Sequence, residues 1–183
     1  MIKENLWVGA LLASYTFLPK LAKSVDKAIK ARVKSGFMSQ HLNYGISAEE
    51  LVVSLIALNE RKVLLINTKV IVDEICSKLK TEDLKLLRLR YFEHKQFSDI
   101  AVILNCALRT VFRRHDRLLQ HAAFEAERFG YGKSWFNEKC AEDSFFAALL
   151  DRLGRTDRID EEERERNDEV SGKRTEKELC GSC

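Results

Sequence analysis

Tight turns are scarce in this sequence, and this scarcity limits the folds open to it more than any other feature. The 183 residues include eight glycines and one proline, the residues on which most tight turns depend. An all-β sandwich or barrel needs many such turns and is therefore disfavoured. The chain is 45 % hydrophobic and 32 % charged, which is enough apolar material for one large domain or two small ones. We expect an all-α protein.

The first part of the chain repeats apolar residues at three- and four-residue steps from Leu6 to Val33, as one face of a helix does. Pro19 either interrupts this helix or opens its second part, because proline is tolerated in a first helical turn. Basic residues lie mostly off the apolar stripe: Lys20, Lys23, Lys27, Lys30, Arg32 and Lys34. We expect these side chains to form a solvated surface, with contact to phosphates as the alternative.

A long second helix is predicted after a loop at residues 35–36 and 41–45. Ser47, followed three residues later by Glu50, has the spacing of a capping box, and apolar residues then continue for roughly thirty residues. A helix this long and apolar needs a packing partner. Residues 1–80 are therefore predicted to form a helical hairpin or small bundle, with a dimer seam as the alternative.

Charge is distributed unevenly along the chain. The net charge is +3 over residues 1–77, +5 over residues 78–133 and −5 over residues 134–183, which together give the total of +3. A basic middle joined to an acidic end is typical of a nucleic-acid surface with an acidic tail.

The basic middle begins with two short predicted helices. Thr81 is placed to cap the first helix, whose inner face is Leu84, Leu87 and Tyr91, before the pattern breaks at residues 93–95. The second helix begins at Phe97. Its buried side is predicted to consist of Ile100, Ala101, Ile103 and Leu104.

A third helix is predicted from Leu108 to about Phe124, after a tight turn. Asn105 lies where the chain reverses, and asparagine tolerates the left-handed conformation better than most residues. Val111 is spaced to pack against the small Ala101. This is a helix-turn-helix pattern, whose second helix normally lies in the major groove of DNA. The predicted scaffold is Ile100, Ala101, Leu104, Asn105 and Val111.

The third helix carries a basic face. Arginines recur there at three- and four-residue steps, and their forked guanidinium groups suit both guanine edges and phosphates. The predicted DNA-binding residues are Leu108, Arg109, Thr110, Arg113, Arg114 and Arg117.

At this point the sequence resembles a known family. From Thr81 to about Phe124 the chain is similar to region 4 of the sigma-70 family, on the stretch LKLLRLRYFEHKQFSDIAVILNCALRTVFRRHDRLL. It is closer still to phage-type late transcription regulators of the ArpU and RinA kind. The resemblance implies a DNA-binding transcription regulator, with double-stranded DNA and RNA polymerase as partners.

The chain departs from the family pattern at three positions. Asn105 stands where glycine is usual in the turn, and Ala107 stands where serine or threonine usually caps the third helix. His115 occupies a position that is often aliphatic, so we expect Phe112 to contribute to the inner face. Residues 1–80 also lack the aromatic and basic content of a promoter-melting domain, so we do not expect this protein to initiate transcription alone.

The rest of the chain is predicted to support the helix-turn-helix domain, which we assign to residues 81–136. In its last segment, FGYGKSWF, Gly130 is expected to stop the third helix. The aromatics of this segment are expected to pack back onto the helix-turn-helix, with stacking on bases as the alternative. Residues 137–154 are predicted to form an amphipathic helix that Gly154 closes. Residues 155–183 form a charged tail, expected to be disordered or a solvated helix.

No motif indicates an enzyme, a metal site or a cofactor. The sequence shows no nucleophile beside a base, no glycine-rich phosphate loop and no paired carboxylates in an apolar frame. A zinc set of His115 and His121 with Cys106 and Cys140 is disfavoured, because the two histidines are six residues apart on one helix and do not share a face. The pair Cys180 and Cys183 has no second pair of ligands nearby. Five cysteines, an odd number, favour a reducing compartment.

We therefore expect a cytoplasmic, non-membrane, all-α regulator that binds DNA and has a homodimer as a further possible assembly. The apolar run at residues 6–13 is too short to cross a bilayer. The rival interpretation is a module that binds RNA polymerase or a sigma partner and has little contact with DNA. The two differ in whether the arginines are exposed together or lie around a protein-binding apolar surface at Leu108 and Phe112. A purely structural helical assembly protein is a third, weaker interpretation.

Overall fold

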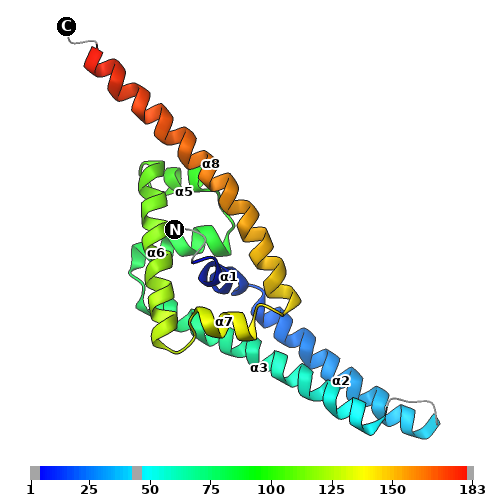
Figure 1. Cartoon of the computed structure of the whole chain (residues 1–183). Helices are drawn as coiled ribbons and strands as arrows, with labels where there is room; N and C mark the ends of the chain where they lie inside the picture. The colour runs from blue at the N-terminus through cyan, green and yellow to red at the C-terminus, as the bar shows by residue number, and fades with distance from the viewer. Residues whose placement is uncertain (1–4, 43–46, 181–183) are drawn as a thin grey trace. The chain divides into compact units, whose positions relative to one another are not determined.

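The computed structural model describes residues 5–42 and 47–180, and every regular element in these ranges is helical. The predicted all-α class is confirmed (Figure 1). The elements in chain order are α1 (Leu6–Ser14), α2 (Leu18–Leu42), α3 (Ala48–Lys78), α4 (Thr81–Leu87), the π-helical turn η2 (Arg88–Phe92), α5 (Phe97–Ile103), α6 (Leu108–Arg128), α7 (Lys133–Lys139) and α8 (Ser144–Cys180). No helix in the described ranges combines the length and apolar character needed to cross a membrane.

The chain forms two compact units. The hairpin unit is Ser14–Glu74, and the core unit is Met1–Ala13 together with Ile75–Cys183. The predicted segment 1–80 therefore does not coincide with one unit, because α1 belongs with the C-terminal helices. The reason is packing: Trp7 of α1 is buried, with its ring centroid 6.3 Å from that of Phe136.

The hairpin unit consists mainly of α2 and α3 in antiparallel order, as predicted. Tyr15 donates a hydrogen bond of 2.6 Å to Asp73, and Lys62 forms an ion pair of 2.6 Å with Asp26. Residues later along α2 thus contact residues earlier along α3, so the two helices are antiparallel. Pro19 lies in the first turn of α2, so it opens this helix and does not break it.

The start of α3 has the predicted capping box. The backbone N–H of Glu50 donates to Ser47 Oγ at 3.1 Å, and the backbone N–H of Ser47 donates to Glu50 Oε2 at 2.9 Å. These two bonds satisfy N–H groups that a helix start otherwise leaves unpaired.

The predicted loop at residues 35–36 is wrong, because α2 continues to Leu42. Gly36 is buried, and a Cβ atom added there would lie 2.5 Å from Leu51 Cδ2. The glycine therefore allows a close approach between two helices and does not make a turn. Residues 43–45 of the predicted loop lie outside the described part of the chain.

Aromatic rings join the helices of the core unit. Phe136 of α7 is buried, and its ring centroid lies 5.9 Å from that of Phe146 in α8. The rings of Tyr131 and Trp135 pack against each other at 5.0 Å. The rings next to Phe136 belong to α1 and α8, whereas packing onto the helix-turn-helix was expected.

The C-terminal boundaries differ from the prediction. The expected helix over residues 137–154 is divided between α7 and α8, and α8 continues through Gly154 to Cys180. The charged segment after residue 154 is therefore helical in the described range. One interior glycine costs a helix only about 1 kcal/mol, and contacts beyond it hold this helix in place: Asp160 is buried beside Arg90. Cys183, the last residue of the terminal cysteine pair, lies outside the described residues.

Candidate nucleic-acid interface

The turn between α5 and α6 has a hydrogen-bond pattern that ends one helix and starts another. Asn105 has a positive φ of 48°, as its position in the sequence predicted. Its N–H donates to Val102 O at 3.1 Å, and the Cys106 N–H donates to Ala101 O at 3.0 Å. These are the two bonds of a Schellman motif, with asparagine in place of the usual glycine. The turn is thus closed by the backbone itself.

The scaffold residues lie on both sides of this turn. Ile100, Ala101 and Val111 are buried where α5 packs on α6, whereas Leu104 is half-buried. Ile103 was predicted to be buried but is 45 % exposed, because α5 ends there and its last turn faces solvent.

Neither α4 nor α6 begins with a side-chain cap, although one was predicted for α4 at Thr81. The N-cap of α4 is Lys80, one residue before the expected Thr81, and its side chain makes no capping hydrogen bond. Ala107 is the N-cap of α6, with φ −63° and ψ 143°, and its methyl group offers no acceptor. The first N–H groups of α6 therefore keep their partial positive charge beside the arginines that follow.

Helix α6 is about one turn longer than predicted, since it ends at Arg128 instead of Phe124. It stops where Gly130 adopts a φ of 82°, as the glycine predicted. The Tyr131 N–H donates to Ala126 O at 2.9 Å and the Gly130 N–H to Glu127 O at 2.9 Å, which closes this end as well.

Three arginines share one exposed face of α6. Arg109, Arg113 and Arg117 follow one another at four-residue steps, and all three are exposed. We call them the arginine row. Arg117 is oriented along the helix by a 3.3 Å hydrogen bond from its Nε to Arg113 O. The row starts one residue after the first residue of the helix, directly beside the turn.

The other predicted DNA-binding residues are less accessible. Thr110 and Leu108 are half-buried, and Arg114 is half-buried with its guanidinium 3.7 Å from Glu82 of α4. The structure therefore brings Arg109, Arg113 and Arg117 together and places Arg114 at the edge of the same surface, next to an acidic side chain.

Comparison with protein-family models, characterised proteins and solved structures gave no match.

The inner side of α6 is packed into the core unit. Phe112 is buried against Phe97, with ring centroids 4.8 Å apart, so it contributes to the inner face as expected. His115 is buried as well, and its Nε2 lies 3.0 Å from the Tyr91 hydroxyl. Burial, followed by the nearby positive charges of Arg90 and Arg164, lowers the pKa of His115 to about 3. The ring is therefore neutral at physiological pH and acts as a core residue.

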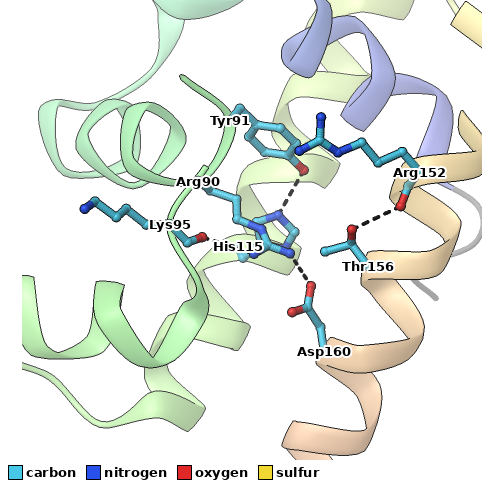
Figure 2. Close-up of polar contacts among 7 residues, drawn as sticks. All are labelled: Arg90, Tyr91, Lys95, His115, Arg152, Thr156 and Asp160. Atoms are coloured by element: carbon cyan, nitrogen blue, oxygen red, sulfur yellow. Dashed lines mark hydrogen bonds and ion pairs between the residues drawn. The ribbon is translucent and has the colours of Figure 1, made fainter. Parts of the chain in front are cut away.

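An ion pair joins η2 to α8 beside this histidine (Figure 2). Arg90 pairs with Asp160, and the side chains of both residues are about nine-tenths buried. Arg90 also donates to Lys95 O at 3.1 Å and lies 4.0 Å from the centre of the Phe97 ring. This one arginine thus connects α8 to both short helices that precede the turn.

A second ion pair holds α8 against α6. Arg164 lies 2.7 Å from Asp116 and 4.9 Å from the centre of the Phe112 ring. Asp116 is the only acidic residue in the first half of α6, and its charge is thereby offset by a cation from α8. No sequence pattern indicates this contact, because the two residues are 48 positions apart.

An exposed apolar pair beside the turn was also missed. Val102 is 81 % exposed and Ile103 is 45 % exposed, both at the end of α5. Ile103 was predicted to lie on the buried side of this helix, whereas Val102 was given no role, and both lie where α5 ends.

In the described part of the chain, no cluster of histidine, cysteine, aspartate or glutamate could hold a metal ion. His121 lies 3.7 Å from Glu125, and Cys140 is buried, which raises the pKa of its thiol to about 12. A thiol with this pKa stays protonated and is a poor metal ligand.

Proposed function

We propose that this chain is a cytoplasmic transcription regulator, a binding protein and not an enzyme, that reads duplex DNA with the first half of α6 in the major groove. In this arrangement the arginine row contacts base edges and phosphates, and α5 lies across the DNA backbone. The sequence resemblance to sigma region 4 points to the same role.

The observation that carries the proposal is the exposure of Arg109, Arg113 and Arg117 on one face, next to the turn. A protein-binding surface on α6 would need Phe112 to be available among the arginines, but Phe112 is 3 % exposed and packs on Phe97. The accessible face of the helix is cationic at its start, which suits a polyanion better than an apolar partner.

The test begins with selection of preferred sequences from a random duplex library by the full chain. The affinity for the selected duplex is then measured by fluorescence anisotropy. Arg113→Ala should weaken binding by about 5- to 150-fold, the range expected for loss of one bidentate base contact. Circular dichroism should show unchanged helicity, because Arg113 is exposed.

Arg158→Ala is the matched control. It removes the same charge from an exposed position on α8 and should leave the affinity for the selected duplex within twofold, about 0.4 kcal/mol. Selection that enriches no sequence, or equal affinities of the unaltered chain and Arg113→Ala, would contradict the proposal.

A second candidate is binding to RNA polymerase, which the exposed pair Val102 and Ile103 favours. Apolar side chains this exposed are common at protein contacts. Val102→Asp should then abolish capture of the polymerase from the native cell, whereas Arg113→Ala should leave capture unchanged. If this pattern appears and no DNA sequence is selected, the second candidate replaces the first.

A further inference from the structure

Helix α3 of the hairpin unit has an apolar stripe that is largely exposed. Five aliphatic side chains of α3 are between 45 % and 53 % exposed: Val52, Ile56, Val63, Ile66 and Val70. Asn59 is also exposed and falls within the same stripe. We call these six residues the α3 seam. They extend over 18 positions, about 27 Å of helix.

The spacing of the seam is that of a coiled coil. Its members follow one another at steps of four, three, four, three and four residues, which is a 3.5-residue repeat. A helix with this repeat presents its apolar residues to a second helix that winds around it. A helix surrounded by solvent does not require such a repeat.

Three contacts between α3 and α2 in the described residues lie off the seam: Ser54 accepts a 2.9 Å hydrogen bond from Arg32, Lys62 pairs with Asp26, and Leu51 packs close to Gly36. Helix α2 therefore packs on other residues of α3, and the seam is available to another helix.

We propose that a second copy of this chain covers the seam, so that two α3 helices form a parallel, in-register coiled coil about a two-fold axis. The same surface then serves both partners, as a two-fold interface requires. This inference is independent of DNA binding, since it rests on the hairpin unit alone.

The one polar member of the seam, Asn59, favours the parallel register over the antiparallel one. In this register the two Asn59 side chains meet at the same level, where each amide can donate to the carbonyl of the other. In an antiparallel pairing centred on the seam, each Asn59 would face Val63 of the other copy, and its amide would be buried without a partner.

Sedimentation equilibrium of the full chain tests the seam. The unaltered protein should have the mass of two chains, and Val63→Glu should shift it to one chain with at least a tenfold weaker association. Ala57→Glu is the matched control, because Ala57 is exposed on the same helix but off the seam, and it should remain a dimer. A one-chain mass for the unaltered protein overturns the proposal, as does a Val63→Glu variant that associates as strongly as the unaltered chain.

Mild oxidation of single cysteine variants tests the register. Asn59→Cys should give chains linked in pairs beyond the level seen with the unaltered protein, whose own cysteines set the background. Ala57→Cys should stay at that background. A dimer in which Asn59→Cys does not link overturns the in-register pairing.

Discussion

At the scale of single residues, His115 shows how a polar side chain can replace an aliphatic one inside a helix bundle. The resemblance to sigma region 4 predicted an apolar residue at this position. The imidazole is nevertheless buried between Tyr91, which shares a hydrogen bond with it, and the edge-on ring of Phe97 at 4.8 Å. Tyr91 is itself protonated, since burial raises the pKa of its hydroxyl well above the ordinary value. Two neutral polar groups thus satisfy each other in the core.

Burial of a neutral histidine makes stability depend on pH. The pKa of His115 is about 3 in the folded chain, against an ordinary value of 6.5. Below pH 6.5 the unfolded chain therefore binds a proton that the folded chain does not, and stability falls by about 1.4 kcal/mol per pH unit. Stability should continue to fall until the pH approaches the pKa of His115 in the folded chain.

His115→Gln should lose less stability to acid, because glutamine keeps a polar group beside Tyr91 but does not titrate. Urea unfolding at several pH values between 7 and 5 measures the difference between the two chains. The free energy of unfolding of the unaltered chain, minus that of His115→Gln, should decrease or change sign as the pH falls. Two parallel pH profiles would contradict a neutral buried His115.

Ala107 offers a stabilising substitution. As the N-cap of α6 it already has extended backbone geometry, but it has no side-chain acceptor. Ala107→Ser should supply one and raise the free energy of unfolding by about 1 kcal/mol. Thermal unfolding measures the gain. Ala148→Ser, at an exposed position inside α8, is the control and should give no gain.

At the scale of elements, two ion pairs hold α8 against η2 and α6. Asp160→Ala would leave Arg90 buried beside Phe97 without its carboxylate partner, and we expect a loss of about 3–5 kcal/mol. Urea unfolding should show a clear decrease in the midpoint.

Asp151→Ala is the control on the same helix. It breaks an ion pair with Arg155 in which both side chains are 65 % exposed, so the expected loss is at most about 1 kcal/mol. Similar losses for the two variants would show that the Arg90–Asp160 pair is not the main contact of α8.

Element boundaries were predictable where local chemistry decides them. The capping box at Ser47, the left-handed Asn105 and the stop at Gly130 are each read from a few neighbouring residues, and each was found. Helix α2 continues through Gly36, and helix α8 continues through Gly154, for a different reason. Helix α2 packs against Leu51, and helix α8 is held by contacts such as that of Asp160 with Arg90. These partners are distant in sequence, so no local pattern shows them.

The same distinction applies to the candidate site. The arginine row was predictable, because its residues lie on one helix and their spacing fixes their common face. The contact of Glu82 with Arg114, and that of Arg164 with Asp116, join separate helices and depend on how these pack. Of the six predicted α6 residues, Leu108, Thr110 and Arg114 are half-buried and offer less surface than the arginine row.

At the scale of the whole molecule, the small net charge of the chain is distributed between the two units in an unexpected way. The basic and acidic ends of the core unit cancel, and the hairpin unit carries the surplus of +3. Five exposed lysines on α2 repeat at three- and four-residue steps and account for this surplus: Lys20, Lys23, Lys27, Lys30 and Lys34. This surface was expected to be solvated, with phosphate contact as the alternative.

If the chain binds DNA, the two cationic surfaces should contribute differently. Arginines on α6 can distinguish bases, whereas lysines along α2 can only neutralise phosphates. The triple variant Lys23→Gln, Lys27→Gln, Lys30→Gln should therefore weaken binding to random-sequence DNA. It should not change which DNA sequence the chain selects from the library. The slope of log affinity against log salt concentration should decrease by up to about 3, since each lost phosphate contact removes about 0.9.

Lysine-to-arginine changes at the same three positions provide the matched control, because they keep the charge while altering the side chain. They should retain the full salt slope. Anisotropy titrations at several salt concentrations compare the three chains. Equal slopes for the glutamine and arginine variants would mean that the lysines of α2 are in contact with solvent alone, and that the cationic surface of α6 carries all of the phosphate contacts.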